Sequence, residues 1–210
     1  MINEINSKSF DNIDNKNQFN PEKRMDTNER VDKAAESKGF IPDSRLEKTD
    51  YYSTYDERIA QAPKEGWDGK RGESLCRSLK EAVNKELAKF GLEGILYKKG
   101  VPDAGFEKCA VEKVSIEMTE KIDINMKKAR TEIAKKWNEQ NKDGRKDWNA
   151  REVHKYQKEN GLVIHECSNR KDCYLIPEVI HKEFTHTGGR FECKKMNERL
   201  GIRKDVKFDE

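Results

Sequence analysis

Hydrophobic positions at helical spacing predict three helices in the middle of the chain. In each, apolar side chains recur every three or four residues, which places them on one face. Glycines or small polar residues bound each pattern, as is typical of helix ends. The predicted helices are residues 75–90, ended by Gly91 and Gly94; residues 124–137, ended by residues 141–144; and a helix capped by Asp147 or Asn149 that runs to about Asn160, with Gly161 past its end.

Shorter apolar runs, some of which alternate with polar residues, predict strands. They are bounded by glycine or by polar turns such as Lys98–Lys99–Gly100. An earlier apolar cluster, residues 51–59, is followed by the chain breakers Pro63 and Gly66. The predicted strands are residues 94–97, 111–116, 162–165 and 173–176.

The last two strands belong to a ββα unit. A turn at residues 168–170 joins them as a hairpin, and Pro177 then stands where the first position of a helix favours proline. We expect a short helix from Glu178 that is stopped by Gly188–Gly189. Helices and antiparallel strands in this order predict an α+β fold with several packed helices.

The first 45 residues differ in composition from the rest. They are rich in Asn, Asp, Lys, Ser and Glu and nearly lack aliphatic side chains. Such a segment cannot bury enough apolar surface to offset the entropy lost on ordering, so residues 1–45 are expected to be disordered or extended. Only 33% of the 210 residues are hydrophobic and 40% are charged, and one compact domain is expected at residues 46–210.

The pattern also limits where the protein works. No apolar run approaches the roughly 18 residues that a membrane span requires. The N-terminal stretch lacks the apolar segment of a secretory signal peptide. We therefore expect no membrane insertion, and either a cytoplasmic protein or one exported by a route without such a signal.

Charge is unevenly distributed along the chain, although the formal net charge is only +3. Residues 121–210 contain 22 Lys and Arg against 16 Asp and Glu, whereas residues 1–120 contain 21 against 24. This asymmetry indicates a C-terminal half that faces a polyanion, although charge runs are also common on solvated faces.

The five cysteines argue against a closed zinc site. No CxxC pair is present, so a structural site of the CxxC…CxxC type is not expected. Reduced thiols are the ordinary interpretation. A disulfide between Cys167 and Cys173 is the alternative for a protein that spends time outside a cell.

Three of the four histidines fall in the ββα unit. His165 ends its first strand and precedes Glu166, while His181 lies in the helix and His186 at the helix end. Imidazoles and a carboxylate that converge suit a divalent ion such as Zn²⁺, Ni²⁺, Mn²⁺ or Mg²⁺. Such an ion polarises phosphate while a neighbouring base activates water. An isolated histidine is usually a surface or core residue, which is our interpretation of His154.

Three stretches, residues 66–74, 94–103 and 162–192, taken in this order resemble the HNH/endonuclease VII-type nuclease domains of bacterial polymorphic toxins. Residues 162–192, LVIHECSNRKDCYLIPEVIHKEFTHTGGRFE, resemble the group's WHE or WHH pattern followed by IH and HxGG. Residues 66–74, GWDGKRGES, and 94–103, GILYKKGVPD, resemble two upstream motifs. The resemblance implies a ββα-metal, treble-clef-like HNH core at about residues 162–190.

The sequence departs from this pattern in ways that affect the roles of two residues. Ile164 replaces a tryptophan, Ala104 replaces an aromatic residue, and Glu166 replaces the second histidine of the WHH form. By position, the resemblance makes His165 a metal ligand and Glu166 the general base. By chemistry the reverse is attractive, because imidazole titrates near pH 6.5 and a carboxylate binds hard cations well. We favour His165 as base with Glu166, His181 and His186 around the metal, and both assignments stay open.

Further charged residues are candidates for the site. Glu73 is interpreted as an extra carboxylate near the metal and Arg71 as a phosphate ligand, although Glu73 also suits a helix start, where the helix dipole favours a carboxylate. Asp103 is interpreted as a turn residue rather than as a partner that orients a histidine. Arg190 and Lys182 flank the site and are expected to bind nucleic-acid phosphates, unless they are plain surface charges.

The resemblance implies a metal-dependent endonuclease with one divalent ion, Mg, Mn, Ni or Zn. We expect double-stranded DNA as the substrate, action as an antibacterial toxin in the target-cell cytoplasm, and a cognate immunity protein. An RNase that uses the same site is one alternative. A non-catalytic, metal-stabilised nucleic-acid-binding module is another, and chelation would unfold it while metal would stimulate no cleavage.

Overall fold

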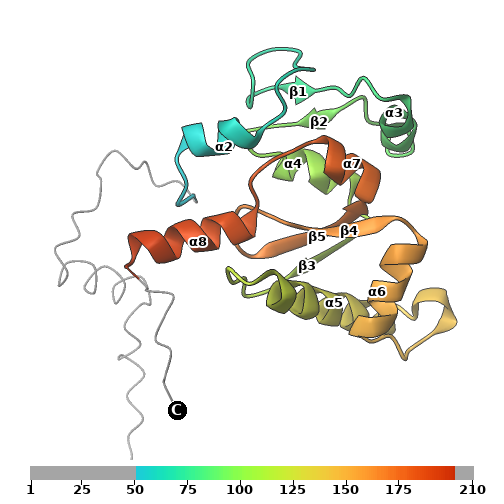
Figure 1. The fold of residues 1–210 in the computed structure, drawn as a ribbon. Helices are drawn as coiled ribbons and strands as arrows, with labels where there is room; N and C mark the ends of the chain where they lie inside the picture. The colour runs from blue at the N-terminus through green and yellow to red at the C-terminus, as the bar shows by residue number, and fades with distance from the viewer. Residues whose placement is uncertain (1–50, 202–210) are drawn as a thin grey trace, which may run out of the picture. The chain divides into compact units, whose positions relative to one another are not determined.

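The computed structural model describes residues 51–201, and these form the predicted α+β fold (Figure 1). The disorder expected for residues 1–45 lies outside the described residues. The described helices are α2 (Tyr55–Gln61), α3 (Glu81–Ala88), α4 (Asp103–Phe106), α5 (Ile122–Glu139), α6 (Ala150–Glu159), α7 (Glu178–Glu183) and α8 (Gly189–Arg199), with short 3₁₀ helices at Glu107–Cys109 and Lys142–Gly144. The strands are β1 (Leu75–Cys76), β2 (Ile95–Leu96), β3 (Glu112–Ser115), β4 (Leu162–Glu166) and β5 (Asp172–Pro177).

A three-stranded antiparallel sheet in the order β3-β5-β4 lies at the centre. Its hairpin, β4–β5, is the one predicted, and it pairs His165 with Tyr174 and Glu166 with Cys173. β1 and β2 form a separate two-stranded antiparallel sheet.

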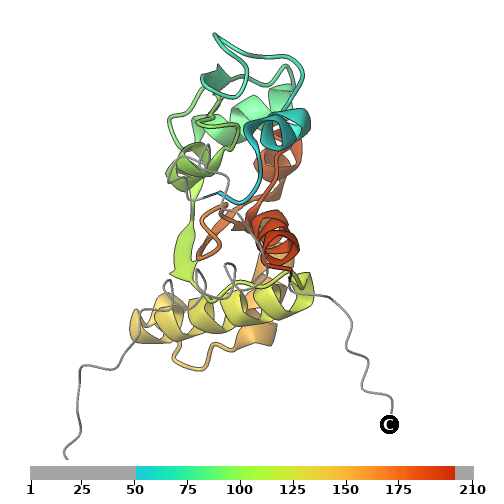
Figure 2. The same ribbon diagram turned by 90° about the vertical axis from the view of Figure 1, so that its left-hand side faces the viewer.

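Alternate side chains of β5 enter two different hydrophobic cores, because successive residues of a strand point to opposite faces. Cys173 and Leu175 pack with α5 and α6, which include the buried Trp137. Ile176 packs on the other face with Phe106 and Ile180 of α4 and α7. Figures 1 and 2 show α5 and α6 as a layer on one side of the sheet, with α4 and α7 on the other.

None of the helices within residues 51–201 combines the length and the apolar character that a membrane span requires.

The longer predicted elements are confirmed. α5 and α6 occupy the predicted second and third helices, and Asn149 caps α6 by accepting hydrogen bonds from two backbone N–H groups. β3 also lies within its predicted range. These elements have enough apolar positions for burial to determine their structure.

The predicted helix at residues 75–90 is wrong in its first half. Leu75 and Cys76 form β1 and pair with β2, and only Glu81–Ala88 is helical. Leu79 fitted the helical spacing, but its side chain is 83% exposed. The spacing of Leu75 and Leu79 was coincidental, because the helix buries only the face that carries Val83 and Leu87.

The expectation that Gly188–Gly189 stops the last helix is also wrong. α7 ends at Glu183, whereas Gly188 is the N-cap of α8. Pro177 likewise precedes the helix as its N-cap and does not occupy its first position. The glycines are needed for a different reason: a Cβ on Gly188 would lie 2.8 Å from the Glu166 carbonyl oxygen, and one on Gly189 would lie 2.4 Å from that of Cys167.

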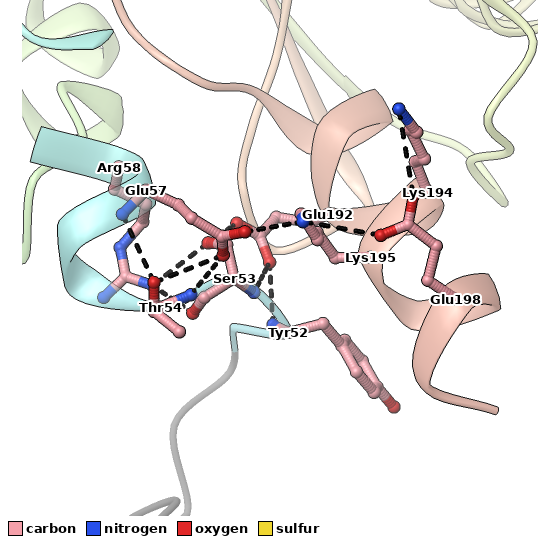
Figure 3. Close-up of polar contacts among 9 residues, drawn as sticks. All are labelled: Tyr52, Ser53, Thr54, Glu57, Arg58, Glu192, Lys194, Lys195 and Glu198. Carbon is pink, nitrogen blue, oxygen red and sulfur yellow. Dashed lines mark hydrogen bonds and ion pairs between the residues drawn. The ribbon is translucent and has the colours of Figure 1, made fainter. Parts of the chain in front are cut away.

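A buried polar junction connects α8 to the segment that precedes α2 (Figure 3). The Glu192 carboxylate accepts hydrogen bonds from the Tyr52 and Ser53 N–H groups, at 2.7 and 2.9 Å, and from the Ser53 hydroxyl. The Arg58 guanidinium donates to the Ser53 carbonyl at 2.6 Å. α2 itself begins with a capping box between Thr54 and Glu57, a signal that the sequence carried and that the helix prediction did not use.

Candidate metal centre

The three histidines of the ββα unit come together as predicted. His165 lies in β4 and His181 in α7, while His186 lies in the loop before α8 and not at the helix end. One ring nitrogen from each lies within 4.8 Å of the other two, so the group can hold a metal ion. The strand, the helix and the loop meet here because the hairpin returns the chain to the end of β4.

His165 is fully buried, and a carboxylate fixes its ring. Its Nε2 lies 2.8 Å from Asp103 Oδ1, and the other oxygen of Asp103 accepts a hydrogen bond from the Ser168 N–H at 2.8 Å. Asp103 is thus the first residue of α4 and a partner of a histidine, which corrects its interpretation as a turn residue. A carboxylate behind a ligating imidazole fixes the ring tautomer and raises the basicity of the other nitrogen.

The partners of His165 and His186 fix which nitrogens face each other. His186 Nδ1 lies 2.7 Å from the Phe184 carbonyl oxygen, to which it donates because a carbonyl only accepts. His165 Nε2 likewise donates to Asp103, so the remaining nitrogens, His165 Nδ1 and His186 Nε2, face each other at 3.1 Å. These two nitrogens can share a cation, either a proton that makes the pair a hydrogen bond or a metal ion that both bind.

Burial favours the neutral form of His181 and His186. Desolvation and then the neighbouring His165 lower the pKa of His181 to about 4. The same two causes, with His181 as a further one, lower the pKa of His186 well below its usual value. Phe106 contributes to the apolar surroundings, since its ring centroid lies 4.8 to 5.7 Å from all three imidazoles. Neutral nitrogens are the form that binds a metal ion.

Glu166 lies beside the histidines at the end of β4. Its side chain is buried, and Oε1 accepts a hydrogen bond from Asn125 Nδ2 at 2.6 Å. Desolvation raises the pKa of Glu166, against the opposing effects of Asn125, Arg190 and His165. Asn125 is itself held by Thr119, whose N–H, carbonyl and hydroxyl it contacts.

The histidines and Glu166 open onto a groove. Arg190 lines it, as the sequence predicted for a residue that flanks the site. The other residues that line it come from α2, α5, β4, α7 and the segment around the start of α8, and they are Gln61, Ile122, Ile164, His165, Glu166, His181, His186, Thr187, Gly188 and Phe191.

Three predicted site residues are not among those that line the groove. The Arg71 guanidinium donates to the carbonyl oxygens of Pro63 and Ala62, at 2.8 and 2.6 Å. Glu73 accepts a hydrogen bond from the Lys99 N–H, and Lys182 forms an ion pair with Glu178 on α7. Their roles at a metal or a phosphate stay predictions.

Among residues 51–201, His154 and the five cysteines are the remaining candidates for a metal site or a disulfide. His154 is half-buried on α6, with its Nδ1 unpartnered among the described residues. All five cysteines lie within the described residues as buried free thiols, so Cys167 and Cys173 form no disulfide. Cys167 joins Asp103 and His165 in a group with metal-ligand geometry, but desolvation strongly raises its pKa and so disfavours the thiolate.

One comparison with known protein families matches the part of the chain that contains this centre. Residues 94–188 match the family described as the DNase/tRNase domain of colicin-like bacteriocins. The matched segment includes Asp103, Asn125, Glu166 and the three histidines. No curated protein and no solved structure matches the chain.

Proposed function

Because residues 94–188 match a colicin-like DNase/tRNase domain, a nuclease toxin domain, we propose that the protein is an HNH-type, metal-dependent endonuclease. The observation that carries the proposal is the histidine group itself. One ring nitrogen from each of the three histidines lies within 4.8 Å of the other two, on a hairpin, a helix and a loop that follow one another in the chain. This ββα succession is the arrangement that the HNH resemblance implies.

A divalent cation fits the donor set. His165, His181 and His186 would hold it, and Asp103 would keep the His165 ring in its ligating tautomer. Three imidazoles suit Zn²⁺ or Ni²⁺ better than Mg²⁺, which prefers oxygen ligands. When bound, such an ion supplies positive charge that polarises the scissile phosphate and stabilises the departing oxygen.

Glu166 is proposed as the general base, with His165 as a ligand. This assignment follows the family position of the two residues. It is supported by the geometry, because His165 Nε2 donates to Asp103 and leaves only Nδ1, which faces His186 within the histidine group. Glu166 lines the groove and accepts a hydrogen bond from Asn125, and its raised pKa makes it a stronger base than an exposed carboxylate. It would take a proton from the attacking water.

DNA is proposed as the substrate. RNA carries a 2′-hydroxyl that can attack its own phosphate, so RNA cleavage needs no activated water. DNA lacks that group, and its hydrolysis requires a base for water and charge at the leaving oxygen. Glu166 would supply the base, and a cation held by the histidine group would supply the charge. An RNase, including one that cuts tRNA, is the second candidate, because the family description names both substrates.

We further propose that the toxin acts in the cytoplasm of a target bacterium. A nuclease that cuts cellular DNA endangers the cell that makes it. A cognate immunity protein in the producer is therefore part of the proposal.

Cleavage of plasmid DNA and, separately, of total tRNA tests the proposal. Each substrate is incubated with the protein and Mg²⁺, Mn²⁺, Ni²⁺ or Zn²⁺, with EDTA as a control. His181→Ala tests the metal site, and His154→Ala is the matched variant of a histidine outside it. We expect metal-dependent nicking of DNA that His181→Ala abolishes and His154→Ala retains. Cleavage of tRNA alone would overturn the proposal that DNA is the substrate. If the folded protein cuts neither nucleic acid, the proposal that it is a nuclease is overturned.

A further inference from the structure

The N-terminus of α8 lies in the groove beside the histidines. Gly188, its N-cap, and Arg190 both line the groove. A glycine at the N-cap has no side chain to bond the first N–H groups of the helix, and the structure has no such cap bond.

Two backbone donors at this end have no partner among residues 51–201. The first bonded N–H groups of the helix are those of Phe191 and Glu192, which both donate to the Gly188 carbonyl oxygen. The N–H groups of Gly189 and Arg190 precede them and bond to none of the described residues. Free N–H groups at a helix N-terminus, together with the helix dipole, favour an anion.

A second, independent feature is the hydroxyl of Thr187. Thr187 lines the groove and is only 5% exposed, yet its Oγ1 has no hydrogen-bond partner among the described residues. A buried hydroxyl without a partner is uncommon, because its desolvation is not compensated. A ligand that enters the groove would supply the missing partner.

The charge of the first turn of α8 also suits an anion. Arg190 is exposed and its side chain makes no ion pair or hydrogen bond within the described residues. Glu192, the acidic residue of the same turn, has its carboxylate bonded to Tyr52 and Ser53 at the junction of Figure 3. The Glu192 carboxylate is thus bonded away from the groove, whereas the Arg190 guanidinium lines the groove, where its charge also acts on Glu166.

The sequence maintains this position of the helix end. Only glycine fits at residues 188 and 189, because any Cβ there would collide with the backbone of Glu166 or Cys167. The free donors are therefore adjacent to the proposed base and to the histidine group.

We infer that the first turn of α8, Thr187 to Arg190, binds a backbone phosphate of the nucleic acid next to the phosphate that is cut. The inference rests on the proposed nuclease function for its ligand. The Gly189 and Arg190 N–H groups and the Thr187 hydroxyl donate to phosphate oxygens, and the Arg190 guanidinium neutralises the charge. Thr187 and Arg190 are positioning residues in this account, since they fix the strand relative to the metal and Glu166.

Binding without cleavage tests this inference. The affinity for a fluorescein-labelled 20-bp DNA duplex is measured by anisotropy in EDTA, for the wild type, Thr187→Val and Arg190→Gln. Loss of the hydroxyl bond in Thr187→Val should weaken binding about fivefold. Arg190→Gln should weaken binding at least as much and lower the salt slope by about 0.9, as expected for one lost phosphate contact. Thr131→Val and Lys158→Gln are matched controls on α5 and α6 and should bind as the wild type does.

A second readout uses inorganic phosphate and does not require DNA. In ¹H–¹⁵N spectra, phosphate should shift the Gly189 and Arg190 amide signals of the wild type, and Thr187→Val should reduce those shifts. Unchanged amide signals, or wild-type DNA affinity in both folded variants, would overturn the inference. If the wild type cuts no nucleic acid but these signals shift, the nuclease proposal fails and the phosphate site stands. If the wild type cuts nucleic acid normally and both variants bind DNA like the wild type, the nuclease proposal stands and the phosphate site fails.

Discussion

Two glutamates are buried in different surroundings. Glu166 lies in the groove and Glu192 at the α2–α8 junction, and the comparison shows how the same side chain can have two roles. Glu192 is fully buried and accepts three hydrogen bonds, from the Tyr52 and Ser53 N–H groups and the Ser53 hydroxyl. Glu166 accepts one, from Asn125, and opens onto the groove beside three histidines. A carboxylate whose oxygens are fully bonded holds the fold together, whereas one that retains lone pairs beside a groove is free to accept a proton.

The largest effect should come from Glu166→Gln. The amide cannot accept a proton, so the rate of metal-dependent DNA cleavage should fall by about 10³-fold, within the range for loss of a general base. Thermal unfolding should change little because the amide still bonds Asn125. The measurement is single-turnover cleavage of a plasmid. An active Glu166→Gln variant would remove the distinction between the two glutamates.

Glu192→Ala should have the opposite profile. It leaves two backbone N–H groups and a hydroxyl without their acceptor, which should lower the free energy of unfolding by about 3 kcal/mol. Cleavage per folded molecule should stay near the wild-type rate below the melting transition. Urea unfolding and active-site-normalised kinetics measure the two quantities. Loss of cleavage without loss of stability would contradict a structural role for Glu192.

A third prediction concerns pH in the metal-free protein. Burial lowers the pKa of His181 to about 4 in the folded state, against about 6.5 when unfolded, so the unfolded chain takes up the proton first as pH falls. Stability should therefore be lost between about pH 6.5 and pH 4, by on the order of 2 kcal/mol from this residue. Urea unfolding in EDTA across this range, compared with His181→Gln, isolates the contribution. The same slope in both proteins would show that His181 titrates normally in the fold.

The smallest effect should come from the contact between Asn125 and Glu166. Asn125→Ser is expected to lower the cleavage rate about tenfold in the wild type, because the carboxylate loses the donor that fixes it. In a Glu166→Gln background the same change should have little further effect on the residual rate, since the two residues then act as one unit. Its effect on stability should persist in both backgrounds. Independent, additive losses of rate would show that Asn125 does not act through Glu166.

The elements that the sequence predicted are those whose structure depends on residues close together in the chain. α5, α6 and the β4–β5 hairpin were predictable, because each has an apolar face that local periodicity reveals. β1 and α2 are short and α8 is mostly polar, and contacts with distant segments, such as that between Glu192 and Ser53, stabilise them. Gly188 and Gly189 resemble the glycines that end a helix. Their role is to let the start of α8 approach the backbone of Glu166 and Cys167.

The site residues show the same contrast between neighbours in the sequence and residues that are far apart in it. The three histidines were found because they fall within one short ββα unit, where a hairpin brings them together. Asp103 and Asn125 lie 62 and 41 residues from their partners His165 and Glu166, and neither periodicity nor spacing relates them. The PD of the upstream motif was the only signal for Asp103, and nothing in the sequence indicated Asn125.

The central claim is that His165 is a metal ligand and Glu166 is not. Isothermal titration of Zn²⁺ into the wild type, His165→Ala and Glu166→Gln tests it most directly. We predict one Zn²⁺ per chain for the wild type and for Glu166→Gln, with affinity at least 100-fold weaker in His165→Ala. Retention of Zn²⁺ by His165→Ala together with its loss from Glu166→Gln would reverse the two roles and contradict the account.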